Sequence, residues 1–129
     1  MVYHDIQQLD SLYLIREVAF DRGYQGVHFG TRLQSHFGEG RVVSFPQGIL
    51  SMNPPFRELQ ELLLTKRIHH DRNPVLRWMA SNCAAEQRGG LTKPSKDLSS
   101  EKIDGITALV MGMGRAMLAT VEAPSISWL

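Results

Sequence analysis

The stretch REVAFDRGYQGVHFGTRLQSHFGEGRVVSF (residues 16–45) decides the fold that we expect for this chain. REVAF (16–20) and RVVSF (41–45) are short apolar runs that indicate buried strands. Between them, residues 24–36 have apolar side chains at helical spacing, and two glycines follow. Strand, helix and strand in this order predict two parallel strands joined by a right-handed crossover.

Helices and one hairpin are expected on either side of this βαβ unit. Because proline is tolerated in the first turn of a helix, Pro54-Pro55 predicts a helix start, and Asn73-Pro74 predicts the start of a shorter helix. Ser99 or Ser100 is expected to cap the last helix, and Gly89-Gly90 is a hairpin signal. Apolar spacing predicts helices over residues 4–14, 54–66, 74–82 and about 100–119, with a flexible tail at 120–129.

Length and composition restrict the class of protein. The chain has 129 residues, which fits a single domain, and its 43% hydrophobic and 21% charged residues are typical of a globular protein. No apolar run is long enough for a membrane span, and the N-terminus MVYHDIQQLD does not resemble a signal peptide. We therefore expect a cytoplasmic protein with no membrane partner. Its single cysteine, Cys83, excludes an intrachain disulfide and a cysteine metal cluster.

Two aspartates occupy positions where a carboxylate can bind a ligand or a metal ion. Asp21 directly follows the first predicted strand, and ligands gather at the carboxyl ends of strands in parallel sheets. The alternative is that Asp21 forms a turn or caps a helix. Asp104 lies in the first turn of the last predicted helix, and Gly105 beside it suits the approach of a hard cation. The alternative is a surface acid that the helix dipole stabilises.

Local charge gives two further candidates, because a formal net charge of +1 disfavours DNA binding driven by overall charge. Lys93, Lys96 and Lys102 flank Asp104 and could hold phosphates, or they could belong to a solvated loop. His69-His70-Asp71 has the residue types of a metal site, but adjacent side chains point to different faces, which favours a solvated turn. The P-loop pattern is absent from the sequence.

Five stretches of the chain carry a family resemblance. They are REVAFDR (16–22), QGILSMNPPFRELQELLLTKRIHH (47–70), NPVLRWMASN (73–82), KPSK (93–96) and KIDGITALVMGMGRA (102–116). Together they resemble the C-terminal end of the large terminase subunits of tailed phages, over about residues 4–119. NPVLRWMASN and KIDG are the more specific pair.

The resemblance implies the nuclease half of a DNA-packaging motor, which cuts concatemeric double-stranded DNA at the start and end of packaging. It implies an α/β, truncated ribonuclease-H-like fold with a parallel βαβ core and a C-terminal helix. The implied partners are the terminase small subunit and the portal, in the cytoplasm of a bacterial host cell. Three acids hold Mg²⁺ or Mn²⁺ in this family. Asp21 in AFDR corresponds to the second and Asp104 in KIDG to the third.

The resemblance also implies which parts are missing. The ATPase domain and the first nuclease strand with its acid have no counterpart, and Asp5 and Asp10 are poor substitutes. We therefore expect little or no nuclease activity, and favour a remnant prophage gene over an excised fragment. The carboxylates of Asp21 and Asp104 are expected within about 4–8 Å of each other, so that one ion can bridge them.

Two other classes of function stay open. The first is a non-catalytic, prophage-remnant α/β module for binding or assembly; neighbouring packaging genes would favour the nuclease instead. The second is a small-molecule binder, which needs a glycine-rich loop after a strand, whereas only Asp21-Arg22-Gly23 is present. Strand 16–20 is expected to be a bare sheet edge, which predicts a homodimer or higher assembly through edge pairing or helix packing.

Overall fold

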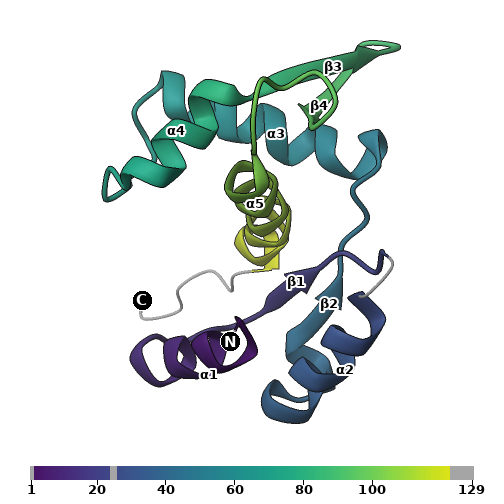
Figure 1. Cartoon of the computed structure of the whole chain (residues 1–129), viewed down its shortest axis with the longest axis vertical. Helices are drawn as coiled ribbons and strands as arrows, with labels where there is room; N and C mark the ends of the chain where they lie inside the picture. The colour runs from purple at the N-terminus through teal and green to yellow at the C-terminus, as the bar shows by residue number, and fades with distance from the viewer. Residues whose placement is uncertain (1, 24–25, 123–129) are drawn as a thin grey trace, which may run out of the picture. The chain divides into compact units, whose positions relative to one another are not determined.

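A parallel pair of short strands packs against a helix in the N-terminal part of the chain (Figure 1). β1 (Val18–Phe20) and β2 (Val42–Ser44) are joined by α2 (Gly26–Phe37). The amide of Phe45 continues the ladder by donating a 2.8 Å hydrogen bond to the carbonyl of Phe20. The predicted α/β class and parallel βαβ core are therefore confirmed.

The structure is a computed structural model that describes residues 2–23 and 26–122. It divides into two compact units, Met1–Pro46 and Gln47–Leu129, each with buried apolar residues of its own. The single domain expected from the length stays a prediction. Over the described ranges, no helix is both long enough and apolar enough to cross a membrane.

The core of the first unit lies between the strands and one face of α2. Leu33, Phe37 and Val42 are buried there, and α1 (Val2–Leu12) and a short 3-10 turn, η1 (Glu39–Arg41), flank them. Partly buried apolar side chains pack around this cluster: Tyr3, Ile6, Ile15, Val18, Phe20 and Phe29.

Gly30 allows the close contact between α2 and β1. A Cβ at Gly30 would lie 2.5 Å from the tip of the Phe20 ring, which is closer than real Cβ contacts come. The helix therefore approaches the strand at a residue that has no side chain.

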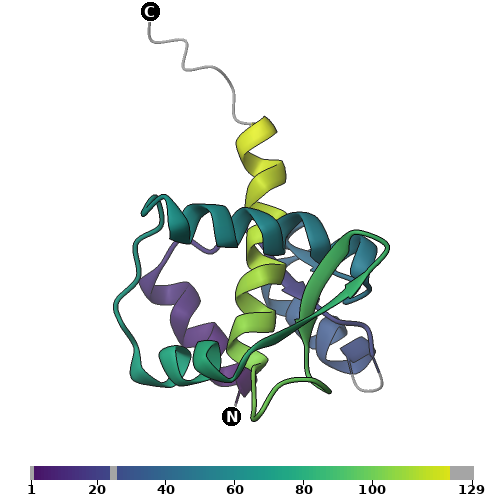
Figure 2. The same cartoon turned by 90° about the horizontal axis from the view of Figure 1, so that it is seen from above.

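Three helices and a hairpin form the second unit. α3 (Ile49–Leu64) crosses α5 (Asp104–Glu122), and α4 (Pro74–Asn82) and the hairpin lie on opposite sides of α5 (Figure 2). The hairpin consists of β3 (Ala84–Arg88) and β4 (Leu91–Ser95). The core contains buried apolar side chains from α3 and α5 and from the residue before α5: Met52, Phe56, Leu59, Ile103, Ile106, Val110 and Met111.

Two local signals in this unit act as predicted. The Asn73 side chain caps α4, since its Oδ1 accepts hydrogen bonds from the amides of Val75 at 2.9 Å and Leu76 at 3.1 Å. Gly89 and Gly90 form the hairpin turn with φ of 57° and 80°, a backbone conformation that favours glycine.

The predicted start of α3 is wrong. The helix begins at Ile49, and Pro54 and Pro55 lie inside it. Neither proline can donate a backbone hydrogen bond, and this normally disfavours a helix interior. Burial of Met52, which is 1% exposed, and of Pro55 places the early turns in the core, and tertiary packing outweighs the local cost.

The predicted cap of α5 is also wrong. The helix begins at Asp104, because Ser99 and Ser100 bind other groups. The Ser99 hydroxyl accepts a hydrogen bond from the Ala84 amide at 2.9 Å and donates one to the carbonyl of Ser95. At its other end α5 continues through Glu122, so the expected flexible tail begins with three helical residues, and residues 123–129 lie outside the described part.

Candidate functional site

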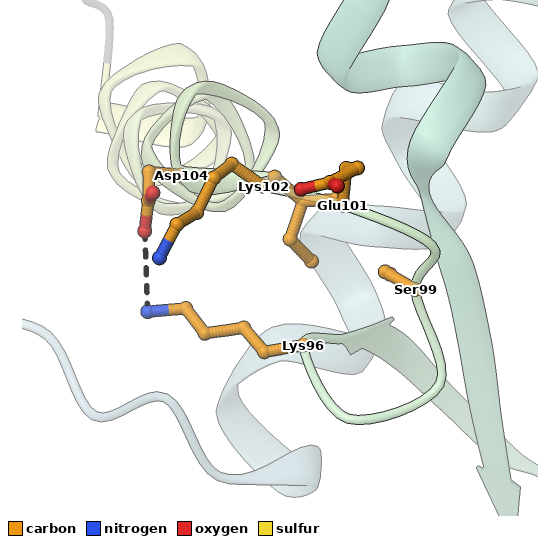
Figure 3. A pocket seen from close by; sticks show the side chains of 6 residues that line it. Lys96, Ser99, Glu101, Lys102 and Asp104 are labelled. Atoms are coloured by element: carbon orange, nitrogen blue, oxygen red, sulfur yellow. Dashed lines mark ion pairs between the residues drawn. The ribbon is translucent and has the colours of Figure 1, made fainter.

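The Asp104 carboxylate lies at the N-terminus of α5, on the rim of an open pocket of about 300 Å³ (Figure 3). Its side chain is 62% exposed, and its Oδ1 lies 3.4 Å from the Lys96 ammonium. Six residues line the pocket: Lys96, Ser99, Glu101, Lys102, Ile103 and Asp104. The aspartate predicted from the KIDG motif is thus accessible and lies in the first turn of α5.

Two of the three predicted lysines join Asp104 in this pocket. Lys96 follows β4 and Lys102 immediately precedes the buried Ile103, and both ammonium groups point towards the Asp104 carboxylate in Figure 3. Glu101 also lines the pocket, so that its lining contains two lysines and two acids. Because the two acids offset the two lysines, the pocket attracts anions only weakly unless a cation neutralises the acids.

Lys93 does not belong to this group. Its ammonium donates a 3.0 Å hydrogen bond to the carbonyl of Gln47 and lies 3.4 Å from the Glu86 carboxylate. With only 25% of its side chain exposed, Lys93 ties the hairpin to Gln47, two residues before α3. These contacts give Lys93 a structural role in the second unit, and its role in phosphate binding stays a prediction.

The loop that carries the two lysines is held by Asn82 of α4. This role of Asn82 was not predicted from the sequence. The Asn82 side chain donates a 3.1 Å hydrogen bond to the carbonyl of Lys102, and its Oδ1 accepts one from the Ser100 hydroxyl at 3.5 Å. The Ser100 amide donates to the carbonyl of Asn82 at 3.2 Å. Asn82 is the last residue of the NPVLRWMASN motif, and this was the available signal.

Gly105 has a structural explanation different from the expected one. Its amide donates a 3.1 Å hydrogen bond to the Met79 sulfur, and a Cβ at this position would lie 2.9 Å from that sulfur and 3.2 Å from a Leu76 methyl group. Gly105 therefore lets α4 pack closely against the start of α5. The structure relates Gly105 to helix packing, and the expected approach of a cation beside it stays a prediction.

Asp21 lies in the first unit, directly after β1. Its side chain is exposed, and its Oδ1 accepts a 3.3 Å hydrogen bond from the amide of Gly23, so the turn-forming alternative is present in the structure. An open pocket of about 240 Å³ lies nearby; it is lined by Phe20, Arg22, Gly30, Thr31, Gln34, Val42 and Ser44. Asp104 is in the other unit, and the predicted distance between the carboxylates of Asp21 and Asp104 stays a prediction.

The residues fit a divalent cation in chemistry but not in number. Carboxylate oxygens are the ligands that Mg²⁺ and Mn²⁺ prefer, and both aspartates offer them in exposed positions. Within residues 2–23 and 26–122, no three His, Cys, Asp or Glu side chains gather as a metal-binding group. A metal held by Asp104 therefore needs further ligands from elsewhere.

The histidine pair and the cysteine take no part in such a group. The Asp71 carboxylate accepts a 3.1 Å hydrogen bond from the Asn73 amide, and the His70 ring accepts one of 3.1 Å from the Arg72 amide. This exposed segment is the solvated turn that the sequence favours. Burial raises the pKa of the Cys83 thiol, which disfavours its thiolate form.

Comparison with known families decides what kind of domain carries these groups. Residues 5–120 match the family of the terminase large subunit, endonuclease domain. The chain belongs to this terminase nuclease family. Protein YmfN of Escherichia coli strain K12 is 38% identical over 83 residues, which are 62% of this chain and 18% of YmfN. The terminase large subunit of Enterobacteria phage HK97 is 34% identical over 76 residues, 58% of this chain and 15% of that protein.

A solved structure extends the match to the fold. The crystal structure of the HK97 bacteriophage large terminase superposes with a TM-score of 0.78 at 29% identity, over 88% of this chain and 24% of that one. The terminase nuclease chain therefore has the ribonuclease-H-like α/β fold that its sequence predicts. It spans less than a fifth of the length of the curated relatives that it matches.

Proposed function

We propose that this chain contributes metal-binding carboxylates to the divalent-metal-dependent cleavage of concatemeric double-stranded DNA during phage genome packaging. Asp104 and Asp21 are the proposed ligands and catalytic acids, and Mg²⁺ or Mn²⁺ is the proposed ion. Membership of the terminase nuclease family supports this reaction class. By the same family argument, the terminase small subunit and the portal are the proposed protein partners.

The exposed Asp104 carboxylate beside two lysines is the observation that carries this proposal. Asp104 is the first residue of α5, and its carboxylate oxygens are of the type that a hard cation prefers. Its ion pair with Lys96 is exposed on both sides, and exposed pairs contribute only about 0–1 kcal/mol. The carboxylate can therefore exchange its ammonium partner for a metal ion at little cost.

The lysines have a separate role in the proposal. When bound, a divalent ion supplies Lewis-acid stabilisation of phosphate charge and a more acidic water. Lys96 and Lys102 would hold the non-bridging oxygens of the DNA phosphate and orient the phosphodiester at Asp104. Neither ammonium is buried, so both can reach an extended backbone.

Little activity is expected from this chain on its own. Only two of the family's three acids have counterparts in it, and the loss of one ligand weakens a site for a hard cation. The chain is therefore proposed to nick DNA weakly or not at all unless the remaining ligands are supplied.

Incubation with supercoiled plasmid and Mn²⁺ tests the proposal, together with a Mn²⁺ titration followed through paramagnetic broadening of backbone amide signals. Slow nicking at most, and broadening centred on Gly105, are expected. Both should disappear in Asp104→Asn and persist in Glu101→Gln, which removes the neighbouring acid of the same pocket. Nicking or broadening that survives in Asp104→Asn contradicts the proposal. Robust nicking by the unaltered chain contradicts only the expectation of weak activity.

A non-catalytic assembly module is the second candidate. The observation in its favour is that each proposed ligand already has a partner within its own unit: Asp21 binds the Gly23 amide and Asp104 pairs with Lys96. Under this alternative, the chain keeps the fold of the terminase nuclease family and binds no Mn²⁺ at Asp104 in the titration above.

A further inference from the structure

The position of Asp104 depends on the segment of chain that leads to it. Residues 96–103 connect β4 to α5 without regular secondary structure, and they carry both lysines of the pocket. Ile103, which is 1% exposed, anchors the last residue of this connection in the core. What holds the preceding residues determines where the Asp104 carboxylate lies.

One side chain of α4 makes the key contacts with this segment. Asn82 donates 3.1 Å to the carbonyl of Lys102, two residues before Asp104, and accepts a 3.5 Å hydrogen bond from the Ser100 hydroxyl. The Ser100 amide reaches the Asn82 carbonyl at 3.2 Å. The same residue therefore holds the segment through its side chain and through its backbone.

A second contact from α4 acts on the other side of Asp104. The Gly105 amide donates to the Met79 sulfur at 3.1 Å, and a Cβ at Gly105 would displace that sulfur, which it would approach to 2.9 Å. The residues before and after Asp104 are thus both held by α4, while the Asp104 side chain itself is 62% exposed. α4 contributes no side chain to the lining of the pocket, yet its contacts fix the position of Asp104.

We infer that Asn82 is a positioning residue for the Asp104 carboxylate and for Lys102. This inference rests on the proposed function, since it gives a role in metal binding to a residue that touches neither metal nor DNA. An amide side chain is suited to it, because the Nδ2 donor satisfies the Lys102 carbonyl while Oδ1 accepts from Ser100. Aspartate has the same shape but no such donor.

The test uses the full chain with Asn82→Ala and Asn82→Asp, and Asn53→Ala as the matched control. Asn53 also ties a backbone amide within the second unit, that of Thr92 at 2.9 Å, but it does so at the hairpin. Mn²⁺ alone is the probe, with affinity measured from the broadening of the Gly105 amide, and hydrogen exchange is measured at Thr107, whose amide donates to Ile103 at 3.0 Å.

Both Asn82 variants should weaken Mn²⁺ binding about tenfold and accelerate exchange at Thr107 by a similar factor, the effect of one lost hydrogen bond. Asn53→Ala should leave both unchanged. Mn²⁺ affinity that stays at the unaltered level in Asn82→Ala and Asn82→Asp, while Asp104→Asn loses it, overturns the role of Asn82. Equal Mn²⁺ binding in Asp104→Asn and the unaltered chain overturns the proposed function, and the inference with it.

Discussion

The ammonium of Lys96 lies 3.4 Å from the Asp104 carboxylate, and each side chain is more than half exposed. The two residues come from different elements of the second unit, the turn after β4 and the first residue of α5. An exposed pair of this kind adds little to stability but sets the local charge that a metal ion or a phosphate meets.

Replacing Lys96 with methionine should therefore separate stability from binding. The free energy of unfolding, measured by urea denaturation, should change by no more than about 0.5 kcal/mol. Mn²⁺ affinity should rise severalfold, because a positive charge is removed from the ligand. DNA affinity should fall, and the slope of its logarithm against the logarithm of the salt concentration should decrease by about one, the value for one phosphate contact. Lys93→Met is the control; it should lower stability instead, since Lys93 ties the hairpin to Gln47.

Two helical glycines should respond in opposite directions to alanine. Gly30→Ala places a Cβ against the Phe20 ring and should destabilise the first unit by about 1–3 kcal/mol, as overpacking does. Gly112 is exposed in α5 with no atom within 4 Å of an added Cβ, so Gly112→Ala should stabilise by about 0.5–1 kcal/mol. Thermal unfolding measures both; a lower midpoint for Gly112→Ala would contradict the packing described for α5.

Loss of the Asn73 cap should destabilise α4, the helix whose contacts hold the residues around Asp104. Asn73→Ala removes the acceptor of the Val75 and Leu76 amides and should lower stability by about 1 kcal/mol. Asn73→Asp keeps the acceptor and should stay close to the unaltered chain. Chemical denaturation compares the three; equal losses in both variants would show that the cap contributes nothing.

The bare edge of β1 predicts self-association. Among the described strands β1 pairs only with β2, and three exposed apolar residues, Leu12, Tyr13 and Leu14, precede it. An edge of this kind is a template for pairing with a second chain. Light scattering at micromolar concentration should give a dimer or larger species.

Leu14→Lys should shift that species towards the monomer, whereas Leu50→Lys, at an exposed leucine of the second unit, should not. A heat-stable monomer at the same concentration would contradict the prediction.

The elements that sequence patterns predicted correctly are those whose signals come from residues close together in the sequence. The parallel pair of β1 and β2 follows from two β-rich runs around a helix, and the start of α4 follows from Asn73-Pro74. Residues that have several possible partners were predicted wrongly. Ser99 is a good helix cap in isolation, yet its hydroxyl bonds to Ala84, which is fifteen positions away in the chain.

The site shows the same division. Asp104 and its two lysines could be found from the KIDG and KPSK stretches, because the helix start and the charges are local features. The structural role of Lys93 depends on Gln47, which lies 46 positions away. The part played by Asn82 likewise depends on a carbonyl 20 positions further along the chain. Contacts of this range have no periodic signature in a single sequence.

Crystals of the chain soaked in Mn²⁺ and measured at the manganese absorption edge test the central claim most directly. The account predicts an anomalous peak at the Asp104 carboxylate, with the Asp21 carboxylate within about 4–8 Å of Asp104 so that one ion can bridge the two. No peak at Asp104 in soaked crystals, or the two carboxylates on opposite faces of the molecule, would contradict the assignment of these aspartates as metal ligands.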